Sequence, residues 1–230
     1  GALAGRDAGE MFDPVRKTPI HEWHESAGAV FENVGHWKRP YCYPRPGEST
    51  EDAVTRECKA VGQSLGIVDA STLGKLDIQG PDAAELLNRV YTNAWNRLEV
   101  GRCRYGLMLG ENGMIFDDGV TARLAPEHFL MSTTTGGVAH VQAWLEEWLQ
   151  CEWRDLKVWV TNVVTQYAVL GLAGPNARAL LAEMCEDVDL ANEAFPFMAV
   201  REGTVANIPA RIFRISFSGE LAYEINVPAD

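Results

Sequence analysis

The feature of the sequence that most constrains the fold is a short pattern that occurs twice. An apolar run is followed by Gly-Pro-Asp-Ala at residues 80–83 and by Gly-Pro-Asn-Ala at residues 174–177, and each copy continues into a helix-like run with a double leucine. Proline suits the first turn of a helix, where its missing N–H costs nothing, so each copy predicts a strand, a turn and a helix. We therefore predict an α+β fold with two similar halves, residues 62–135 and 136–230, rather than a parallel doubly wound sheet.

Local signals predict the remaining elements. Ser49, with Asp52 three residues later, predicts the start of a helix. Apolar residues at helical spacing predict an amphipathic helix over residues 136–150, with its tryptophans in the core. Strands are predicted at residues 64–71, 74–80, 157–163 and 167–172, and as a pair within residues 210–227. Residues 1–17 predict a linker or arm, and residues 18–47 predict loops with one short helix or strand.

Composition narrows the class of partner. The 230 residues carry 32 acidic and 20 basic side chains, for a formal charge of -12, which disfavours binding to nucleic acid or to anionic lipid. Five cysteines, odd in number and without a CxxC pair, argue against a disulfide framework and a zinc site. The sequence shows neither a signal peptide nor a long apolar span, so we expect a cytoplasmic location. The first residue is Gly, and we expect the chain to be a piece of a longer protein.

Two adjacent acids follow a predicted hairpin turn. Asn112-Gly113 predicts a tight turn in which both residues adopt positive φ, with residues 105–110 and 114–123 as paired strands. Alternation then places Asp117 and Asp118 on opposite faces, with Asp118 on the face of Met114 and Phe116. A carboxylate among apolar neighbours is a candidate for chemistry, so we single out Asp118. The alternative is an edge-strand acid that deters aggregation.

Other familiar motifs receive little support. The segment HEWH at residues 21–24 lacks the spacing that puts two metal ligands on one face of a helix, so no metal site is predicted. No Gly-x-Ser-x-Gly elbow occurs, and LGLAGP at residues 170–175 lacks the dinucleotide-binding fingerprint. We therefore expect no flavin or nicotinamide domain within this chain. A second acid within a strand, Glu224, completes the candidates that pattern alone supplies.

Five blocks in one order carry a resemblance to a known family. They are TPIHEWHESAGAVFENVGHWKRPYCYPRPGE, SLGIVDASTLGKLDIQGPDAAELLNRVYTN, GRCRYGLMLGENGMIFDDG, NEAFPFMA and ISFSGELAYEINV. Together they cover about half of the chain. The chain resembles the folate-binding aminomethyltransferases, the family of the glycine-cleavage T-protein, and within that family the carboxy-terminal part of the alpha subunits of heterotetrameric sarcosine oxidases. The resemblance implies the aminomethyltransferase fold with two similar α+β halves, and it implies that a C-terminal barrel domain of the family is missing.

The resemblance also assigns roles to residues. A tyrosine thirteen positions before the key aspartate corresponds to Tyr105 and the catalytic Asp118. The glutamate that holds the pterin corresponds to Glu224, and an aromatic residue seven positions earlier corresponds to Phe217. Leu73, Val120 and Thr134 correspond to further cofactor-binding wall positions. Where the family usually has tyrosine this chain has Phe217, which keeps a stacking surface and loses a hydroxyl, and Leu73 stands where methionine is frequent.

The function implied by the resemblance is capture of a one-carbon unit. The domain would bind tetrahydrofolate and convert the imine or formaldehyde released from sarcosine into 5,10-methylenetetrahydrofolate, with Asp118 as proton acceptor. FAD, FMN and NAD are implied for the full enzyme and lie outside this chain, and the other sarcosine oxidase subunits are the implied partners. Two alternatives stay open. One is a T-protein or dimethylglycine oxidase homologue, which would work with a lipoylated carrier or a fused flavin domain. The other is a non-catalytic folate-binding or assembly module.

Overall fold

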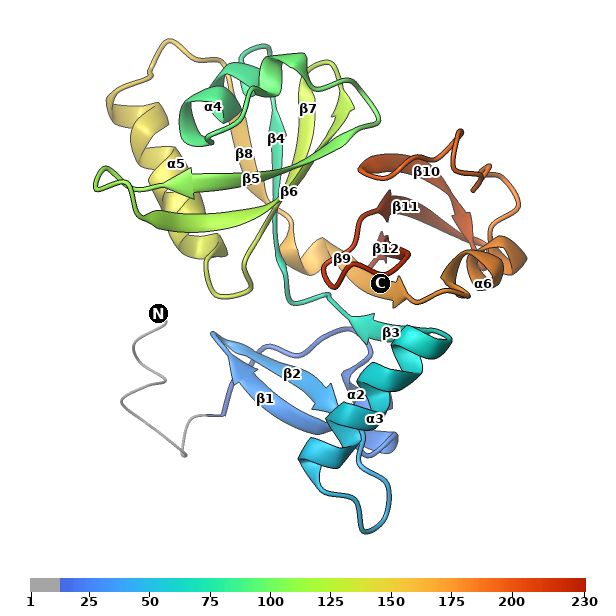
Figure 1. Cartoon of the computed structure of the whole chain (residues 1–230). Coiled ribbons are helices and arrows are strands. Elements are labelled where there is room, and N and C mark those ends of the chain that lie inside the picture. Colours follow the sequence, from blue (N-terminus) through green and yellow to red (C-terminus); the bar gives the residue numbers. More distant parts are fainter. Residues whose placement is uncertain (1–12) are drawn as a thin grey trace. The chain divides into compact units, whose positions relative to one another are not determined.

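The computed structural model describes residues 13–230, which divide by their internal contacts into two compact units (Figure 1). The first unit contains the described residues up to Thr72 together with Thr165–Phe197 and Glu202–Asp230. The second unit contains Leu73–Val164 and Met198–Arg201.

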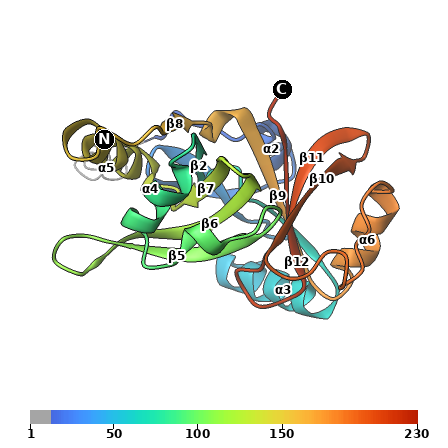
Figure 2. The same ribbon diagram turned by 90° about the horizontal axis from the view of Figure 1, so that it is seen from above.

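The second unit is built on a five-stranded antiparallel sheet with the strand order β5-β6-β7-β4-β8. Figure 2 shows its long β5–β6 hairpin extending from the sheet. The strands are β4 (Gly74–Gln79), β5 (Cys103–Leu109), β6 (Ile115–Ala125), β7 (His128–Thr133) and β8 (Trp159–Asn162). The helices are α4 (Ala83–Val90) and α5 (Val138–Cys151), with the short 3-10 helix η2 (Trp95–Arg97). A further 3-10 helix, η3 (Val164–Gln166), begins at the last residue of the segment 73–164 and continues into the first unit.

Both helices of the second unit cover the same face of its sheet. A Cβ on Gly106 of β5 would meet the ring of Tyr91, which directly follows α4, and a Cβ on Gly74 of β4 would meet Val138 of α5. The strands bury their apolar side chains on this face, among them Leu76 and Met131, which are 0% exposed. Each such side chain contributes roughly 1.5–3 kcal/mol on burial, so this face forms the main core of the unit. The opposite face also buries Ala122 and Leu130, but it leaves Tyr105 half-exposed.

The first unit holds a second five-stranded sheet with the order β10-β11-β12-β9-β3, in which the first three residues of β10 are counted with the second unit. Its strands are β3 (Gly66–Asp69), β9 (Tyr167–Ala173), β10 (Ala199–Val205), β11 (Ile208–Arg214) and β12 (Ala222–Pro228). Its helices are α2 (His21–Ser26), α3 (Thr50–Gln63) and α6 (Ala177–Met184), and a separate hairpin is formed by β1 (Val30–Val34) and β2 (Trp37–Cys42). The predicted cap of α3 is confirmed, because the backbone N–H of Asp52 donates to the hydroxyl of Ser49 at 3.1 Å.

The repeat predicted from the sequence is confirmed in its local geometry. Gly80 and Gly174 both adopt positive φ, 134° and 121°. Ala83 donates its N–H to the carbonyl of Gly80 at 3.0 Å, and Ala177 donates to the carbonyl of Gly174 at the same distance. Helices α4 and α6 follow and are each eight residues long. The Gly-Pro-x-Ala turns therefore perform the same strand-to-helix connection in both units.

The edge strands of the two sheets are exchanged. Strand β3 precedes β4 in the sequence but pairs with β9, while β8 precedes β9 in the sequence but pairs with β4. The division by internal contacts consequently differs from the halves expected from the sequence, 62–135 and 136–230, because a linear cut cannot assign exchanged strands. The strands predicted at residues 64–71 and 74–80 are present as β3 and β4, and they belong to different sheets.

The N-terminal segment contains more regular structure than expected. The arm predicted for residues 1–17 lies outside the described residues as far as residue 12. Beyond it, Arg16 accepts a hydrogen bond from the N–H of Lys38 at 2.9 Å and donates its own N–H to the carbonyl of His36 at 3.1 Å, so the chain runs beside β2. Residues 18–47 form α2 and the complete β1–β2 hairpin rather than loops with one short element.

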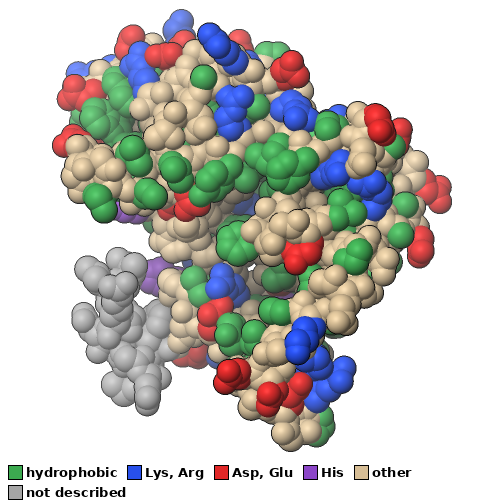
Figure 3. All heavy atoms as spheres, in the orientation of Figure 1, with side chains coloured by type: hydrophobic (Ala, Val, Ile, Leu, Met, Phe, Trp, Pro, Cys, Tyr) green, Lys and Arg blue, Asp and Glu red, His purple; other side chains and the backbone are tan. Residues whose placement is uncertain are grey.

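The surface has no concentration of one charge on the face that Figure 3 shows, where acidic and basic side chains are interspersed. Within residues 13–230, no helix combines the length and apolar character needed to cross a membrane.

Candidate functional site

The β5–β6 hairpin predicted from the sequence is confirmed, but its turn is wider than expected. Tyr105 pairs with Val120 across the two strands. At the tip, Gly113 adopts positive φ (76°) and Asn112 does not. Instead, the Asn112 side chain accepts the N–H of Met114 at 3.0 Å, which stabilises a longer turn.

A β-bulge changes which residues share a face. Met108 pairs with Asp117 and Leu109 pairs with Ile115, so Phe116 is the extra residue. Its ring lies 4.4 Å from His140 and 4.9 Å from Trp144, both on α5. The prediction that Asp118 shares a face with Phe116 and Met114 was therefore wrong, because the bulge interrupts the simple alternation.

The more deeply buried acid of the pair is Asp117, not Asp118. Asp117 is 5% exposed and lies opposite Met108 on the core face. Its Oδ1 accepts the backbone N–H groups of Asp118 at 2.8 Å and of Thr134 at 3.0 Å, and its Oδ2 accepts the Thr134 hydroxyl at 2.8 Å. These donors replace the water that burial removes, which makes a buried carboxylate tolerable.

Asp118 lies on the opposite, half-buried face and is held by Tyr105. The Tyr105 hydroxyl donates to Asp118 Oδ2 at 2.7 Å. This hydrogen bond raises the pKa of Tyr105, with desolvation and the charge of Asp118 acting in the same direction. Among the described residues Asp118 Oδ1 has no hydrogen-bond partner. The second oxygen of a fixed carboxylate is thus available to attract a cation or accept a proton.

Strand register shows what else lies on that face. Val120, opposite Tyr105, is two residues from Ala122, which pairs with Leu130. Leu130 in turn pairs with Asp77 of β4, two residues from Lys75. Sequence reasoning did not single out Lys75, which is 2% exposed in the structure. In GKLDIQ the polar residues Lys75, Asp77 and Gln79 alternate with apolar ones, so the pattern gave no signal that Lys75 is buried.

Two further residues of the second unit, Leu73 and Thr134, were expected to line the cofactor site, and they differ in exposure and in hydrogen bonding. Leu73 is half-buried just before β4, and its carbonyl accepts the ammonium of Lys75 at 2.9 Å. Thr134 is exposed just after β7, with its hydroxyl turned toward Asp117 rather than toward the Asp118 face. Tyr105, Asp118 and Val120 are thus together on one sheet face, with Thr134 attached through Asp117.

The two site residues expected near the end of the chain belong to the first unit. Glu224 is half-buried in β12, between Phe213 of β11 and Gly171 of β9. Phe217 lies in the segment that joins β11 to β12, and its side chain is fully exposed. The first unit therefore places a carboxylate and a free aromatic ring on one hairpin, which are the side-chain types that recognise the edge and the face of a flat heterocycle.

The HEWH segment has a structural environment. His24 is buried, with Nδ1 2.6 Å from the Tyr43 hydroxyl and Nε2 2.8 Å from Asp69 Oδ2. His21 is also buried and lies 3.1 Å from Glu25. The contact between His24 and Asp69 ties α2 to β3 in the sheet of the first unit.

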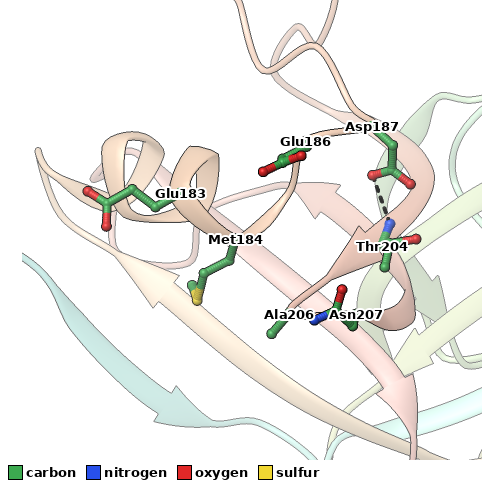
Figure 4. A pocket seen from close by; sticks show the side chains of 7 residues that line it. All are labelled: Glu183, Met184, Glu186, Asp187, Thr204, Ala206 and Asn207. Atoms are coloured by element: carbon green, nitrogen blue, oxygen red, sulfur yellow. Dashed lines mark hydrogen bonds between the residues drawn. The ribbon is translucent and has the colours of Figure 1, made fainter.

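A separate hollow of about 390 Å³ lies in the first unit (Figure 4). Its lining includes the carboxylates of Glu183, Glu186 and Asp187. Asp187 accepts the N–H of Thr204 at 2.9 Å, the contact drawn in Figure 4, and that hydrogen bond lowers the pKa of Asp187. Asp187 therefore has a structural role, as an acceptor for the main chain of β10.

Comparison with known families is decisive for the class of protein. The family model described as the GCVT N-terminal domain matches residues 20–230 of this chain. The chain belongs to this family. It is 57% identical over 229 residues to the sarcosine oxidase subunit alpha of Corynebacterium sp. (strain U-96), covering 99% of this chain and 24% of that protein. It is 30% identical over 221 residues to the human mitochondrial dimethylglycine dehydrogenase, covering 91% of this chain and 25% of that protein.

A solved structure agrees with the fold. The glycine cleavage system aminomethyltransferase T from Bartonella henselae superposes with a TM-score of 0.78 at 28% identity, covering 94% of this chain and 54% of that chain. The aminomethyltransferase fold expected from the sequence is thereby confirmed, with open sheets in both units. The chain spans about a quarter of the length of the oxidase and dehydrogenase relatives.

Proposed function

We propose that this domain captures one-carbon units on tetrahydrofolate, as part of a full-length enzyme that oxidises sarcosine. The observation that carries the proposal is the pair Tyr105 and Asp118: a carboxylate fixed at 2.7 Å by a tyrosine, with its other oxygen available, on the sheet face opposite the core. Membership in the GCVT N-terminal domain family and 57% identity to a sarcosine oxidase subunit alpha support the reaction class.

In the first unit, Glu224 and Phe217 are side chains of the types that recognise a reduced pterin. A pterin is flat and has a guanidinium-like donor edge, so a carboxylate can accept two parallel hydrogen bonds from it. We assign that role to Glu224, with Phe217 as a surface for a ring face. In the second unit, considered by itself, we assign Leu73, Val120 and Thr134 as further cofactor-binding residues, of which Leu73 and Val120 offer aliphatic surface. Bound tetrahydrofolate would supply the nucleophilic nitrogen to which the one-carbon unit is transferred.

The residues of this chain would contribute positioning and charge. Oxidation of sarcosine gives a cationic iminium, and a fixed carboxylate stabilises a cation best where it does not have to reorganise. Asp118 would attract that cation and take up the proton released when the carbon–nitrogen bond forms. The hydroxyl of Tyr105 would keep the carboxylate oriented without neutralising its charge. Holding the partners together would also limit the loss of the one-carbon unit to water as formaldehyde.

The full-length chain would supply what this domain lacks. We propose that flavin and nicotinamide sites lie elsewhere in the full-length chain and its partner subunits, since the relative at 57% identity is itself named as a subunit. A T-protein role with a lipoylated carrier and a dimethylglycine role are the enzymatic alternatives. The 30% identity to dimethylglycine dehydrogenase, against 57% to the oxidase subunit, favours sarcosine.

The experiment uses the full-length chain assembled with its partner subunits. Sarcosine is supplied with and without tetrahydrofolate, and peroxide, formaldehyde and methylenetetrahydrofolate are measured together. Asp118→Asn should leave peroxide production unchanged and lower the captured fraction by about 100-fold. Asp155→Asn, at an exposed aspartate, is the matched control and should change neither product. Unaltered capture by the Asp118→Asn enzyme would leave only a non-catalytic binding or assembly module.

A further inference from the structure

We propose that Asp117 is a positioning residue for the one-carbon transfer, acting through Asp118 and through the loop that precedes α5. The inference rests on the proposed function of Asp118. It concerns a side chain on the core face of the sheet, where no ligand of the opposite face can reach it directly. Its effect on the reaction must therefore pass through the groups that it holds.

The contacts of Asp117 join the catalytic strand to the loop. One oxygen, Oδ1, accepts the N–H of Asp118 at 2.8 Å and the N–H of Thr134 at 3.0 Å. The other oxygen accepts the hydroxyl of Thr134 at 2.8 Å. Strand β6 and the residue after β7 are thereby fixed to each other, and the main chain of Asp118 cannot turn without breaking a charge-assisted hydrogen bond.

The backbone around this carboxylate is packed too closely for the loop to shift. A Cβ on Gly137, the N-cap of α5, would lie 1.9 Å from Asp117 Oδ2 and 2.5 Å from Thr134 Oγ1. A Cβ on Gly119 would lie 2.1 Å from the carbonyl of Ser132. Neither glycine has positive φ, so lack of space for a side chain, rather than backbone conformation, is what requires glycine. A negative charge beside the start of a helix is also favourable to the helix dipole.

This arrangement has two consequences for the reaction. The hydrogen of the Thr134 hydroxyl is committed to Asp117, so Thr134 can act toward a ligand only as an acceptor. The Asp118 carboxylate is fixed from two directions, by Asp117 through its main chain and by Tyr105 through its side chain. Misplacement of a catalytic group by about 1 Å can cost on the order of 100-fold in rate, so a carboxylate with a loosened main chain should capture poorly.

The first test compares Asp117→Ala with Asp117→Asn in the full-length assembled enzyme. The asparagine can keep both backbone hydrogen bonds on Oδ1, while its amide donates to the Thr134 hydroxyl. We expect Asp117→Ala to lower maximal capture of the one-carbon unit by about 10- to 100-fold and Asp117→Asn to restore it to within about threefold. The concentration of tetrahydrofolate that gives half-maximal capture should change little in either variant.

Capture is expressed per sarcosine oxidised in the same sample. A residue needed only for folding would lower the amount of active enzyme and therefore peroxide and captured product together, leaving their ratio unchanged. That result for Asp117→Ala would overturn the proposal. The proposal would also be overturned if Asp117→Asn lowered captured product per sarcosine oxidised as much as Asp117→Ala does. The hydrogen bonds that asparagine keeps would then not be the cause of the effect.

The second test leaves the carboxylate intact and moves its surroundings. Gly137→Ala places a methyl group against Asp117 Oδ2, whereas a Cβ at Gly136 has nothing within 4 Å. We expect Gly137→Ala to lower the captured fraction by about 10-fold or more and Gly136→Ala to leave it unchanged. Equal ratios in the two variants would contradict the proposal even if Asp117→Ala fails to fold. If Asp118→Asn abolishes capture while Gly137→Ala does not, only the role of Asp117 is wrong, and the proposed function stands.

Discussion

The hydroxyl of Tyr105 and the carboxylate of Asp118 are joined by a 2.7 Å hydrogen bond across the β5–β6 hairpin, although they are thirteen positions apart in the sequence. Tyr105 pairs with Val120 and Asp118 pairs with Leu107, so the bond is diagonal on one face of the hairpin. Diagonal neighbours on antiparallel strands lie within reach of a tyrosine side chain. The pair is therefore a direct result of strand register and needs no loop to form it.

Tyr105→Phe tests what this hydrogen bond contributes. The phenylalanine keeps the ring and removes the donor, so Asp118 keeps its charge and loses its orientation. We expect maximal capture of the one-carbon unit to fall about 10-fold, the lower end for loss of a hydrogen bond to a charged group at a half-exposed site. The measurement is captured product per sarcosine oxidised. Tyr41→Phe, at another exposed tyrosine, is the control, and a drop of similar size there would refute the assignment.

The same hydrogen bond predicts a titration. Hydrogen bonding to Asp118 raises the pKa of Tyr105 above its ordinary value of 10.0. The protonated hydroxyl is favoured in the folded chain, so its stabilising effect is complete below that value and is lost as the pH rises through the raised pKa. Ultraviolet difference titration should show one tyrosine that ionises at a higher pH in the wild type than in Asp118→Asn. Identical curves for the two proteins would argue against the hydrogen bond.

Most of the hairpin could be predicted from the sequence, but the positions of its two acids could not. A turn at Asn112-Gly113 and two paired strands on either side of it follow from local preferences, although the turn is wider than predicted. The bulge at Phe116 is accompanied by packing of its ring against His140 and Trp144 of α5, more than twenty residues further along the chain, and no local pattern reports such a contact. Asp117 was passed over for a similar reason, because two of its hydrogen-bond donors belong to Thr134, which lies 17 residues further along the chain.

Gly80 and Gly174 should be equally intolerant of a side chain, because they perform the same connection in the two units. Both have positive φ, and an added Cβ would lie 2.1 Å from the carbonyl of Lys157 in one case and 2.5 Å from that of Val61 in the other. Alanine at either position should destabilise the fold by roughly 2–4 kcal/mol. Gly62→Ala, in α3 with nothing within 4 Å, should instead stabilise it by up to about 1 kcal/mol. Urea unfolding measures all three variants.

The two turns also show why the repeat was visible and the exchange of strands was not. The Gly-Pro-x-Ala turn is determined by residues that are adjacent in the chain, so it could be recognised from the sequence. Which sheet β3 and β8 join is decided by pairing with β9 and β4, about a hundred and about eighty residues away along the chain. Both strands carry apolar residues that are exposed in the structure, Val68 and Trp159. The hydrophobic pattern of the two strands therefore did not indicate which sheet each of them joins.

Asp69 should contribute to the acid sensitivity of the first unit. Burial raises the pKa of Asp69, but hydrogen bonds from Ser71, Thr18 and His24 outweigh it, and the net pKa lies below the ordinary value of 3.8. The stability from this carboxylate is therefore present above that value and is lost as the pH falls below it. Asp69→Asn should unfold at a lower temperature than the wild type at pH 7, and the gap should narrow by pH 3. A gap of constant size would refute this explanation.

Glu224→Gln should separate binding from chemistry if Glu224 recognises the pterin edge. Glutamine keeps the shape of the side chain but offers one acceptor oxygen and no charge, so one of two parallel hydrogen bonds is lost. The tetrahydrofolate concentration for half-maximal capture should rise about 10- to 100-fold, while maximal capture changes little. Asp118→Asn should do the reverse, since its carboxylate is assigned to the reacting cation. Glu193→Gln, at an exposed glutamate of the first unit, is the matched control and should alter neither quantity. A fall in maximal capture with an unchanged half-saturating concentration in Glu224→Gln would place that residue in the chemistry rather than in recognition.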